Sequence, residues 1–223
     1  QKKEVFETFP VFSPDGRKLY FCAAEAKPIP AEYKEIRYSL CSIDFNPEDG
    51  TFGETIDTLV NAAAMKKSIS FPRPSYDGEY IMFTLSDYGN FSIWHKEADL
   101  WLLDLKDGGM RPIKEVNSDD TESFHNWSSN SRWFVFSSRR GDGLYTRLYL
   151  ASMDENGGGG QAFSASSGKS VGVLRPLVYS YNVPDFTSES VKLERRKVER
   201  GNCLAEARSG ESKMIRFFLY SVF

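Results

Sequence analysis

The chain has 223 residues, of which 40% are hydrophobic and 26% are charged, and its formal net charge is −3. This balance is typical of a globular protein with a core and excludes the disordered, collagen-like and membrane-spanning classes. The weakly acidic charge provides no basic field for nucleic acid or anionic lipid, so we expect neither partner. Aromatic residues make up 14% of the chain against two histidines, which favours a fold built from β-sheets.

Three stretches of sequence align without gaps, in chain order FPVFSPDGRKLYF (9–21), FPRPSYDGEYIMF (71–83) and FHNWSSNSRWFVF (124–136). Each has Phe first, Ser fifth, then a turn pair and an aromatic or β-branched run, which predicts a strand, a tight turn and a second strand. The expected structural turn residues are Asp15, Gly16, Asp77, Gly78 and Asn130. We interpret the side chains of Asp15, Asp77 and Asn130 as partners of nearby backbone rather than cation ligands, because one carboxylate per turn is too few for Ca²⁺.

A second pattern follows each copy: RYSLCSIDFNPEDG (37–50), ADLWLLDLKDGG (98–109) and TRLYLASMDENGG (146–158), each a strand that leads to an Asp and a Gly-containing turn. The whole unit recurs after 62 and then 53 residues. Four strands per repeat at such periods are the signature of propeller blades. The inserts after Cys22 and Leu85 are then loops between the second and third strands.

We therefore predict an all-β fold, a β-propeller of about three four-stranded antiparallel blades in a partial ring, with an irregular C-terminal tail. The expected boundaries are 1–8 for the outer strand of a preceding blade, 9–70 for blade 1, 71–123 for blade 2, 124–165 for blade 3, and 166–223 for a linker, a docked segment and a poorly ordered tail. The Gly- and Ser-rich stretch GGGGQAFSASSGKS (157–170) favours a flexible linker. Because three blades cannot close a ring, we expect the chain to be part of a longer propeller, an open arc or one half of a dimer.

The strings FPVFSPDGRKLYF and DLWLLDLKDGG resemble the repeat of TolB-like β-propellers over about residues 5–165. The third copy departs from that pattern, since Asn130 and a serine replace the Asp-Gly turn. The longer strings YGNFSIWHKEADLWLLDL and SFHNWSSNSRWFVFSSRR are similar to an uncharacterised secreted or lipid-anchored subgroup. The resemblance implies a periplasmic or otherwise extracytoplasmic location and no particular reaction.

Candidate binding residues lie in the loops between the second and third strands. The insert after Leu85 contains Trp94 and His95, and the loop SSRRGDGLYTR contributes Arg139, Arg140, Asp142, Tyr145 and Arg147. Aromatic and Arg side chains are enriched at interfaces, although a solvated polar loop is the alternative. For the second histidine, His125, we favour core packing.

No catalytic constellation or metal site is visible, because the chain lacks a nucleophile elbow, a phosphate-binding loop and close cysteine pairs among Cys22, Cys41 and Cys203. We predict a non-catalytic scaffold module that binds a protein or peptide outside the cytoplasm and needs no cofactor. The possible partners include further blades of a longer chain or a second copy. The alternative is a propeller-type enzyme, such as a metal-dependent polysaccharide lyase or a glycosidase-like protein.

Overall fold

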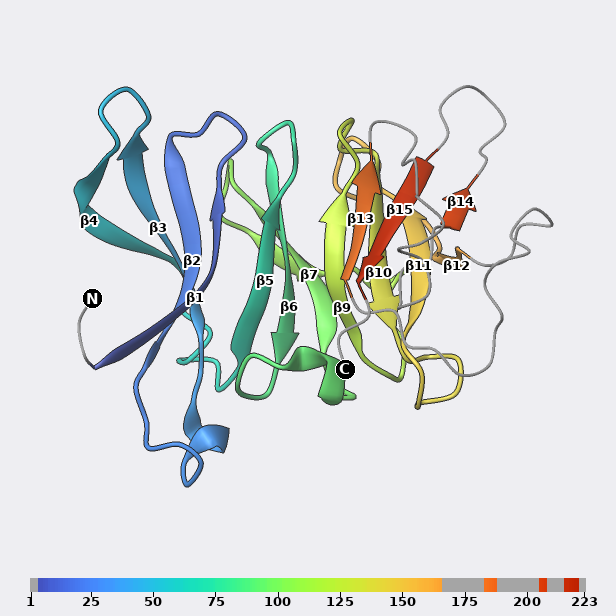
Figure 1. Ribbon diagram of the computed structural model, residues 1–223, viewed down its shortest axis with the longest axis horizontal. Coiled ribbons are helices and arrows are strands. Elements are labelled where there is room, and N and C mark those ends of the chain that lie inside the picture. Colours follow the sequence, from blue (N-terminus) through green and yellow to red (C-terminus); the bar gives the residue numbers. More distant parts are fainter. Residues whose placement is uncertain (1–3, 166–182, 188–204, 208–214, 221–223) are drawn as a thin grey trace, which may run out of the picture.

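The structure is a computed structural model that describes residues 4–165, 183–187, 205–207 and 215–220. Three four-stranded antiparallel sheets stand side by side, each with its strands hydrogen-bonded in chain order (Figure 1). We name them blade 1 (β1–β4), blade 2 (β5–β8) and blade 3 (β9–β12). The expected all-β architecture of about three propeller blades is confirmed.

In each blade the first strand lies at the inner edge of the sheet and the fourth strand at the outer edge. Blade 1 contains β1 (Val5–Phe12), β2 (Lys18–Glu25), β3 (Ser39–Asn46) and β4 (Thr51–Val60). Blade 2 contains β5 (Ser68–Pro74), β6 (Tyr80–Ser86), β7 (Asp99–Asp104) and β8 (Met110–Pro112). Blade 3 contains β9 (Glu122–Trp127), β10 (Trp133–Ser138), β11 (Arg147–Ser152) and β12 (Phe163–Ser164). Since Phe163 and Ser164 pair with β11, the linker predicted from Gly157 begins later than expected.

The first hairpin of every blade is closed by the same side-chain device. In blade 1, Ser13 Oγ donates to Asp15 Oδ1 at 2.6 Å and accepts from the Lys18 backbone N–H at 2.9 Å. Ser75 with Asp77, and Ser128 with Asn130, repeat the arrangement. The residue after the Asp or Asn has positive φ, namely Gly16, Gly78 and Ser131, so a serine adopts the glycine conformation in blade 3.

A phenylalanine with positive φ lies within a β-bulge of every inner strand: Phe9 in β1, Phe71 in β5 and Phe124 in β9. Their rings contact one another from blade to blade in a tilted arrangement, with centroids 4.2 Å apart for Phe9 and Phe71 and 4.7 Å apart for Phe71 and Phe124. These contacts join the inner edges of neighbouring blades.

The bulge also corrects one expected boundary. The repeat is recognised from its phenylalanine, but β1 begins before Phe9 because the chain continues through the bulge as one strand. Val5 to Thr8 pair with β2, in the register Val5 opposite Glu25 and Thr8 opposite Cys22. These residues therefore belong to the inner strand of blade 1 and not to the outer strand of a preceding blade.

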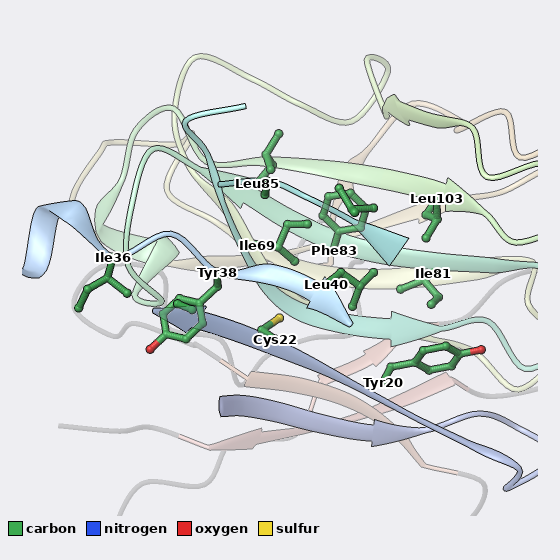
Figure 2. Close-up of a cluster of buried hydrophobic side chains, with 13 residues drawn as sticks. Tyr20, Cys22, Ile36, Tyr38, Leu40, Ile69, Ile81, Phe83, Leu85 and Leu103 are labelled. Carbon is green, nitrogen blue, oxygen red and sulfur yellow. The ribbon is translucent and has the colours of Figure 1, made fainter. Parts of the chain in front are cut away.

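Blades 1 and 2 bury an apolar cluster between their faces. Figure 2 shows that Cys22 and Leu40 of blade 1 lie against Ile69, Ile81 and Phe83 of blade 2. Alternate residues of each strand supply this face, as the pleat requires. A second cluster, which includes Met82, Trp127 and Phe134, lies between blades 2 and 3.

A smaller sheet lies beside blade 3, with the strand order β13 (Val183–Thr187), β15 (Ile215–Tyr220) and β14 (Ala205–Ala207). Strand β13 packs against β9 and extends the series of neighbouring inner strands β1, β5 and β9. Asn126 Nδ2 donates to Asp185 Oδ1 at 2.7 Å across this contact. Most of the region expected to be an irregular tail, residues 166–223, is outside the described residues. Among the residues described, no helix is long and apolar enough to cross a membrane.

Candidate functional site

The loops that join the second and third strands of each blade emerge at one end of the structure, the lower end in Figure 1. They comprise residues 26–38, 87–98 and 139–146, and the first two contain the 3₁₀ turns η1 (Tyr33–Glu35) and η2 (Ser92–Trp94). The opposite end has the tight Ser-Asp hairpins. The loop end therefore carries loops that differ in length between the blades, and loops held on a rigid scaffold are the usual position for binding residues.

Large apolar side chains are exposed on all three loops. We define them as the apolar rim: Ile29 (65% exposed), Tyr33 (47%), Phe91 (71%), Trp94 (74%) and Leu144 (71%). Single exposed apolar residues are ordinary on protein surfaces, but several on adjacent loops at one end indicate an interaction site.

Trp94 and Arg139, two predicted site residues from different blades, are brought together. The guanidinium carbon of Arg139 lies 5.2 Å from the centre of the Trp94 ring, a cation–π arrangement. Its Nη2 donates to the Gly143 carbonyl and its Nη1 to the Ile93 carbonyl. Arg139 thus fixes the orientation of Trp94 while the indole stays exposed.

His95 lies below the rim, where its side chain is 11% exposed. Its Nδ1 is 2.9 Å from Glu97 Oε1, and its ring meets the ring of Tyr88 edge-on at 4.5 Å. Tyr88 in turn meets Tyr33 of blade 1 edge-on at 5.7 Å. Tyr88 therefore connects the loops of blades 1 and 2, and His95 supports the Tyr88 ring.

Arg140 points into the protein. Its guanidinium carbon lies 5.1 Å from the centre of the Phe136 ring and 4.6 Å from the centre of the Tyr149 ring. Its Nη2 donates to Glu122 Oε1 at 2.9 Å and to the Val116 carbonyl. Glu122 is fully buried, so this is an internal ion pair beneath the loop end. Sequence reasoning missed Glu122. The sequence does contain a sign of it: a glutamate stands two residues before Phe124, at the position where the second repeat has the apolar Ile69.

Asp99 at the start of β7 joins the same polar region. Burial raises its pKa to about 6, the carboxylates of Glu122 and Glu97 add to this shift, and Lys67 opposes it. The residue is thus a carboxyl group whose charge state changes in a mildly acidic medium.

Asp142 shapes the loop of blade 3. Its carboxylate accepts hydrogen bonds from the backbone N–H groups of Tyr145 and Leu144, which lower its pKa, and it pairs with Arg147 at 2.6 Å. The Tyr145 side chain is half-buried. The Arg-Gly-Asp triplet of residues 140–142 therefore has both charged members engaged within the protein.

His125 is buried between blades 2 and 3, with Nε2 at 3.0 Å from the Met82 carbonyl oxygen. Burial lowers its pKa to about 3, so the imidazole is neutral. Asp15, Asp77 and Asn130 lie in separate hairpins at the other end. Within the described part of the chain, no group of three or more His, Cys, Asp or Glu side chains is placed to hold a metal ion.

The chain matches no protein-family model and no curated protein. Solved structures with a similar fold include a puromycin-hydrolyzing peptidase of Mycobacterium tuberculosis, at 14% identity and a TM-score of 0.51, covering 74% of this chain and 24% of the peptidase. TolB from Acinetobacter baumannii is 14% identical with a TM-score of 0.44, covering 97% of this chain and 43% of TolB. The β-propeller domain of the trilobed protease from Pyrococcus furiosus is 13% identical with a TM-score of 0.45, covering 97% of this chain and 53% of the protease domain.

The chain thus spans about half or less of the length of each of these proteins. At 14% identity, the similarity to the puromycin-hydrolyzing peptidase concerns the fold alone. The three four-stranded antiparallel sheets, each with its strands hydrogen-bonded in chain order, confirm the predicted partial β-propeller.

Proposed function

We propose that this protein is a non-catalytic binding module that recognises a protein or peptide through the apolar rim at its loop end. The observation that carries the proposal is the exposure of Trp94 and Phe91 together with the internal contacts that hold their loop in place. Apolar anchors that are already ordered lose little conformational entropy when a partner covers them.

The polar residues beneath the rim support this role through position. Ser92 Oγ lies 2.6 Å from Ser123 Oγ, and Thr121 Oγ1 donates to the Ser92 carbonyl at 3.0 Å. Both contacts tie η2 of blade 2 to the first residues of blade 3. These contacts hold the part of the rim that contains Trp94 against blade 3. We expect Trp94 to contribute most to affinity, because Trp is enriched among interface hot spots.

An extracytoplasmic location is part of the proposal. Its support is the resemblance to secreted or lipid-anchored TolB-like sequences. Fractionation of the native host with an antibody against the chain tests it. Recovery with the cytoplasmic markers would contradict the location without affecting the binding proposal.

Selection from a displayed library of random peptides tests the binding role. We expect enriched peptides to bind the wild-type protein and to lose affinity at least about tenfold on Trp94→Ala. Tyr76→Ala is the matched control, because Tyr76 is an exposed aromatic residue (57%) in the hairpin at the opposite end. Selected peptides that respond to Tyr76→Ala and not to Trp94→Ala or Phe91→Ala would refute the rim as the site.

A further inference from the structure

The outer strands of the three blades differ greatly in length. Strand β4 of blade 1 has 10 residues, whereas β8 of blade 2 has 3 and β12 of blade 3 has 2. Blade 1 therefore ends in a long edge strand, which Figure 1 shows at the side of the structure away from β13. In an antiparallel sheet, half of the backbone N–H and C=O groups of such a strand point away from its partner.

The exposure of β4 makes that edge accessible. Residues 51–58 are all exposed, including Phe52 (53%) and Ile56 (52%). Edge strands are commonly protected by charged residues, especially Lys, or by Pro, and β4 contains neither Lys nor Pro, its charged residues being the acidic Glu54 and Asp57. Its pairing with β3 is regular from Ile56 to Thr58, with an irregularity in the register on each side, so this short section is where a further strand can join.

Charge identifies the kind of strand that fits. From Phe45 to Met65 the chain has four acidic residues and no Lys or Arg, the acidic residues being Glu48, Asp49, Glu54 and Asp57. The cation of β2 nearest in the sheet, Lys18, is already paired with Asp44. A second copy of β4 laid antiparallel would bring carboxylates close to carboxylates, which is unfavourable for cross-strand neighbours.

An apolar surface adjoins the acidic edge. Phe52 meets Phe45 at 5.0 Å between ring centroids, and Phe45 meets Phe12 at 5.0 Å. A hollow of about 760 Å³ on the same blade has a mixed lining, which includes Thr58 of β4, Cys41 and Ala23 as well as the charged Glu4, Glu25 and Arg37. Alternate side chains of an added strand point to opposite faces of the sheet, so one set can cover this apolar surface.

We propose that β4 is a strand-addition site for an extended segment of a partner protein in which Lys or Arg residues alternate with apolar residues. The backbone of the segment pairs with the free edge. Its basic side chains lie on the face that Asp57 shares with Ser42, and its apolar side chains lie on the opposite face, where they cover Phe52 and Ile56. This surface is separate from the apolar rim, so the inference does not rest on the proposed function.

Two labelled peptides test the site, acetyl-Thr-Lys-Val-Lys-Val-Lys-Thr-amide and the same peptide with Glu in place of Lys. We expect the Lys peptide to bind at least about tenfold more tightly in fluorescence anisotropy at low salt, since several exposed charge pairs act together. Hydrogen exchange of the β4 amides should slow in its presence. Equal affinity for both peptides, or binding without protection of β4, would overturn the proposal.

Charge reversal locates the effect. Glu54→Lys with Asp57→Lys should invert the preference, so that the Glu peptide binds more tightly than the Lys peptide. Glu32→Lys with Glu35→Lys makes the same charge change on exposed residues of the η1 loop and should leave the preference unchanged. Trp94→Ala should also leave it unchanged, which separates this site from the rim. A dimer in sedimentation that the β4 substitutions dissociate would show a second copy to be the occupant and would refute a basic partner strand.

Discussion

The interface between blades 1 and 2 is filled with apolar side chains, whereas the interface between blades 2 and 3 also contains a buried glutamate and a buried histidine. Among the residues described, the acidic, basic or imidazole side chains that are buried are Glu122 and His125, and both belong to β9 of blade 3. The first interface is stabilised by burial, which depends little on pH. The second depends on the pairing of Glu122 with Arg140 and on a neutral His125, so its stability should vary with pH.

The interface that contains polar groups is also the one that supports the candidate site. The polar groups of the second interface lie under η2, the turn that presents Trp94, and some of them bond directly to that turn. Hydrogen bonds are directional, while apolar packing is not. A polar interface therefore fixes the orientation of the loop residues more sharply than an apolar one of the same size, at some cost in stability.

The largest expected effect is in the apolar interface. Phe83 is fully buried between blades 1 and 2, so Phe83→Ala should reduce the free energy of unfolding by about 3 to 5 kcal/mol. The loss should be the same at pH 5 and pH 7.5 in urea denaturation, because burial raises the pKa of Cys22, Tyr20 and Tyr38 in this cluster and all three stay protonated over this range. A loss that depends strongly on pH would contradict the contrast between the two interfaces.

Next in size is the removal of one member of the buried ion pair. Arg140→Met leaves the Glu122 carboxylate buried without its cation and should cost about 3 kcal/mol at pH 7. The double variant Arg140→Met with Glu122→Leu should recover most of the loss, since it removes the unpaired charge as well. If the double variant is as unstable as the single one, packing around Arg140 and not charge pairing is what stabilises this region.

The repeated blades and the buried ion pair differ in how far they can be inferred from the sequence. The blades were predictable because each hairpin repeats the same Ser and turn residues and each inner strand the same Phe, so local chemistry and periodicity agree. The Glu122–Arg140 pair could not be predicted, because the two residues are 18 positions apart and meet only when β9 and β10 align. The length of β4 was equally hidden, since outer strands carry no repeated motif.

For the candidate site, sequence reasoning identified the right loops but not the direction of each side chain. Trp94 and Arg139 lie in different repeats, and their stacking depends on the packing of blade 2 against blade 3. Arg140 is adjacent to Arg139 and points to the interior, because successive residues leaving β10 face opposite sides. Such alternation is visible only when the register of the strand is known.

The third prediction concerns acid. Burial holds the folded-state pKa of His125 at about 3, below its ordinary value of 6.5, so the unfolded chain takes up a proton first as pH falls. Stability from this group is therefore complete above about pH 6.5 and is lost progressively toward pH 3, by about 1.4 kcal/mol per pH unit. His125→Gln should flatten the fall between pH 6.5 and 4.5 by one proton, whereas His95→Gln, a change at the less buried histidine, should leave most of it. An unchanged slope in His125→Gln would show that another group causes the acid sensitivity.

The smallest effect tests whether the polar interface carries a cost at neutral pH. The pKa of Asp99 is about 6 in the folded protein against an ordinary value of 3.8, so its ionised form is disfavoured by folding. The destabilisation builds up as pH rises from about 3.8 to 6 and is constant above that. Because the side chain is half-exposed, solvent screening limits the effect to about 1 kcal/mol.

Asp99→Asn should therefore raise the stability at pH 7 and have no effect below pH 4. Asp142→Asn is the control of opposite sign, because hydrogen bonds lower the pKa of Asp142 and its loss should destabilise the protein at pH 7. If Asp99→Asn also destabilises at pH 7, Asp99 contributes a favourable contact that outweighs its burial, and the polar interface imposes no cost at this position.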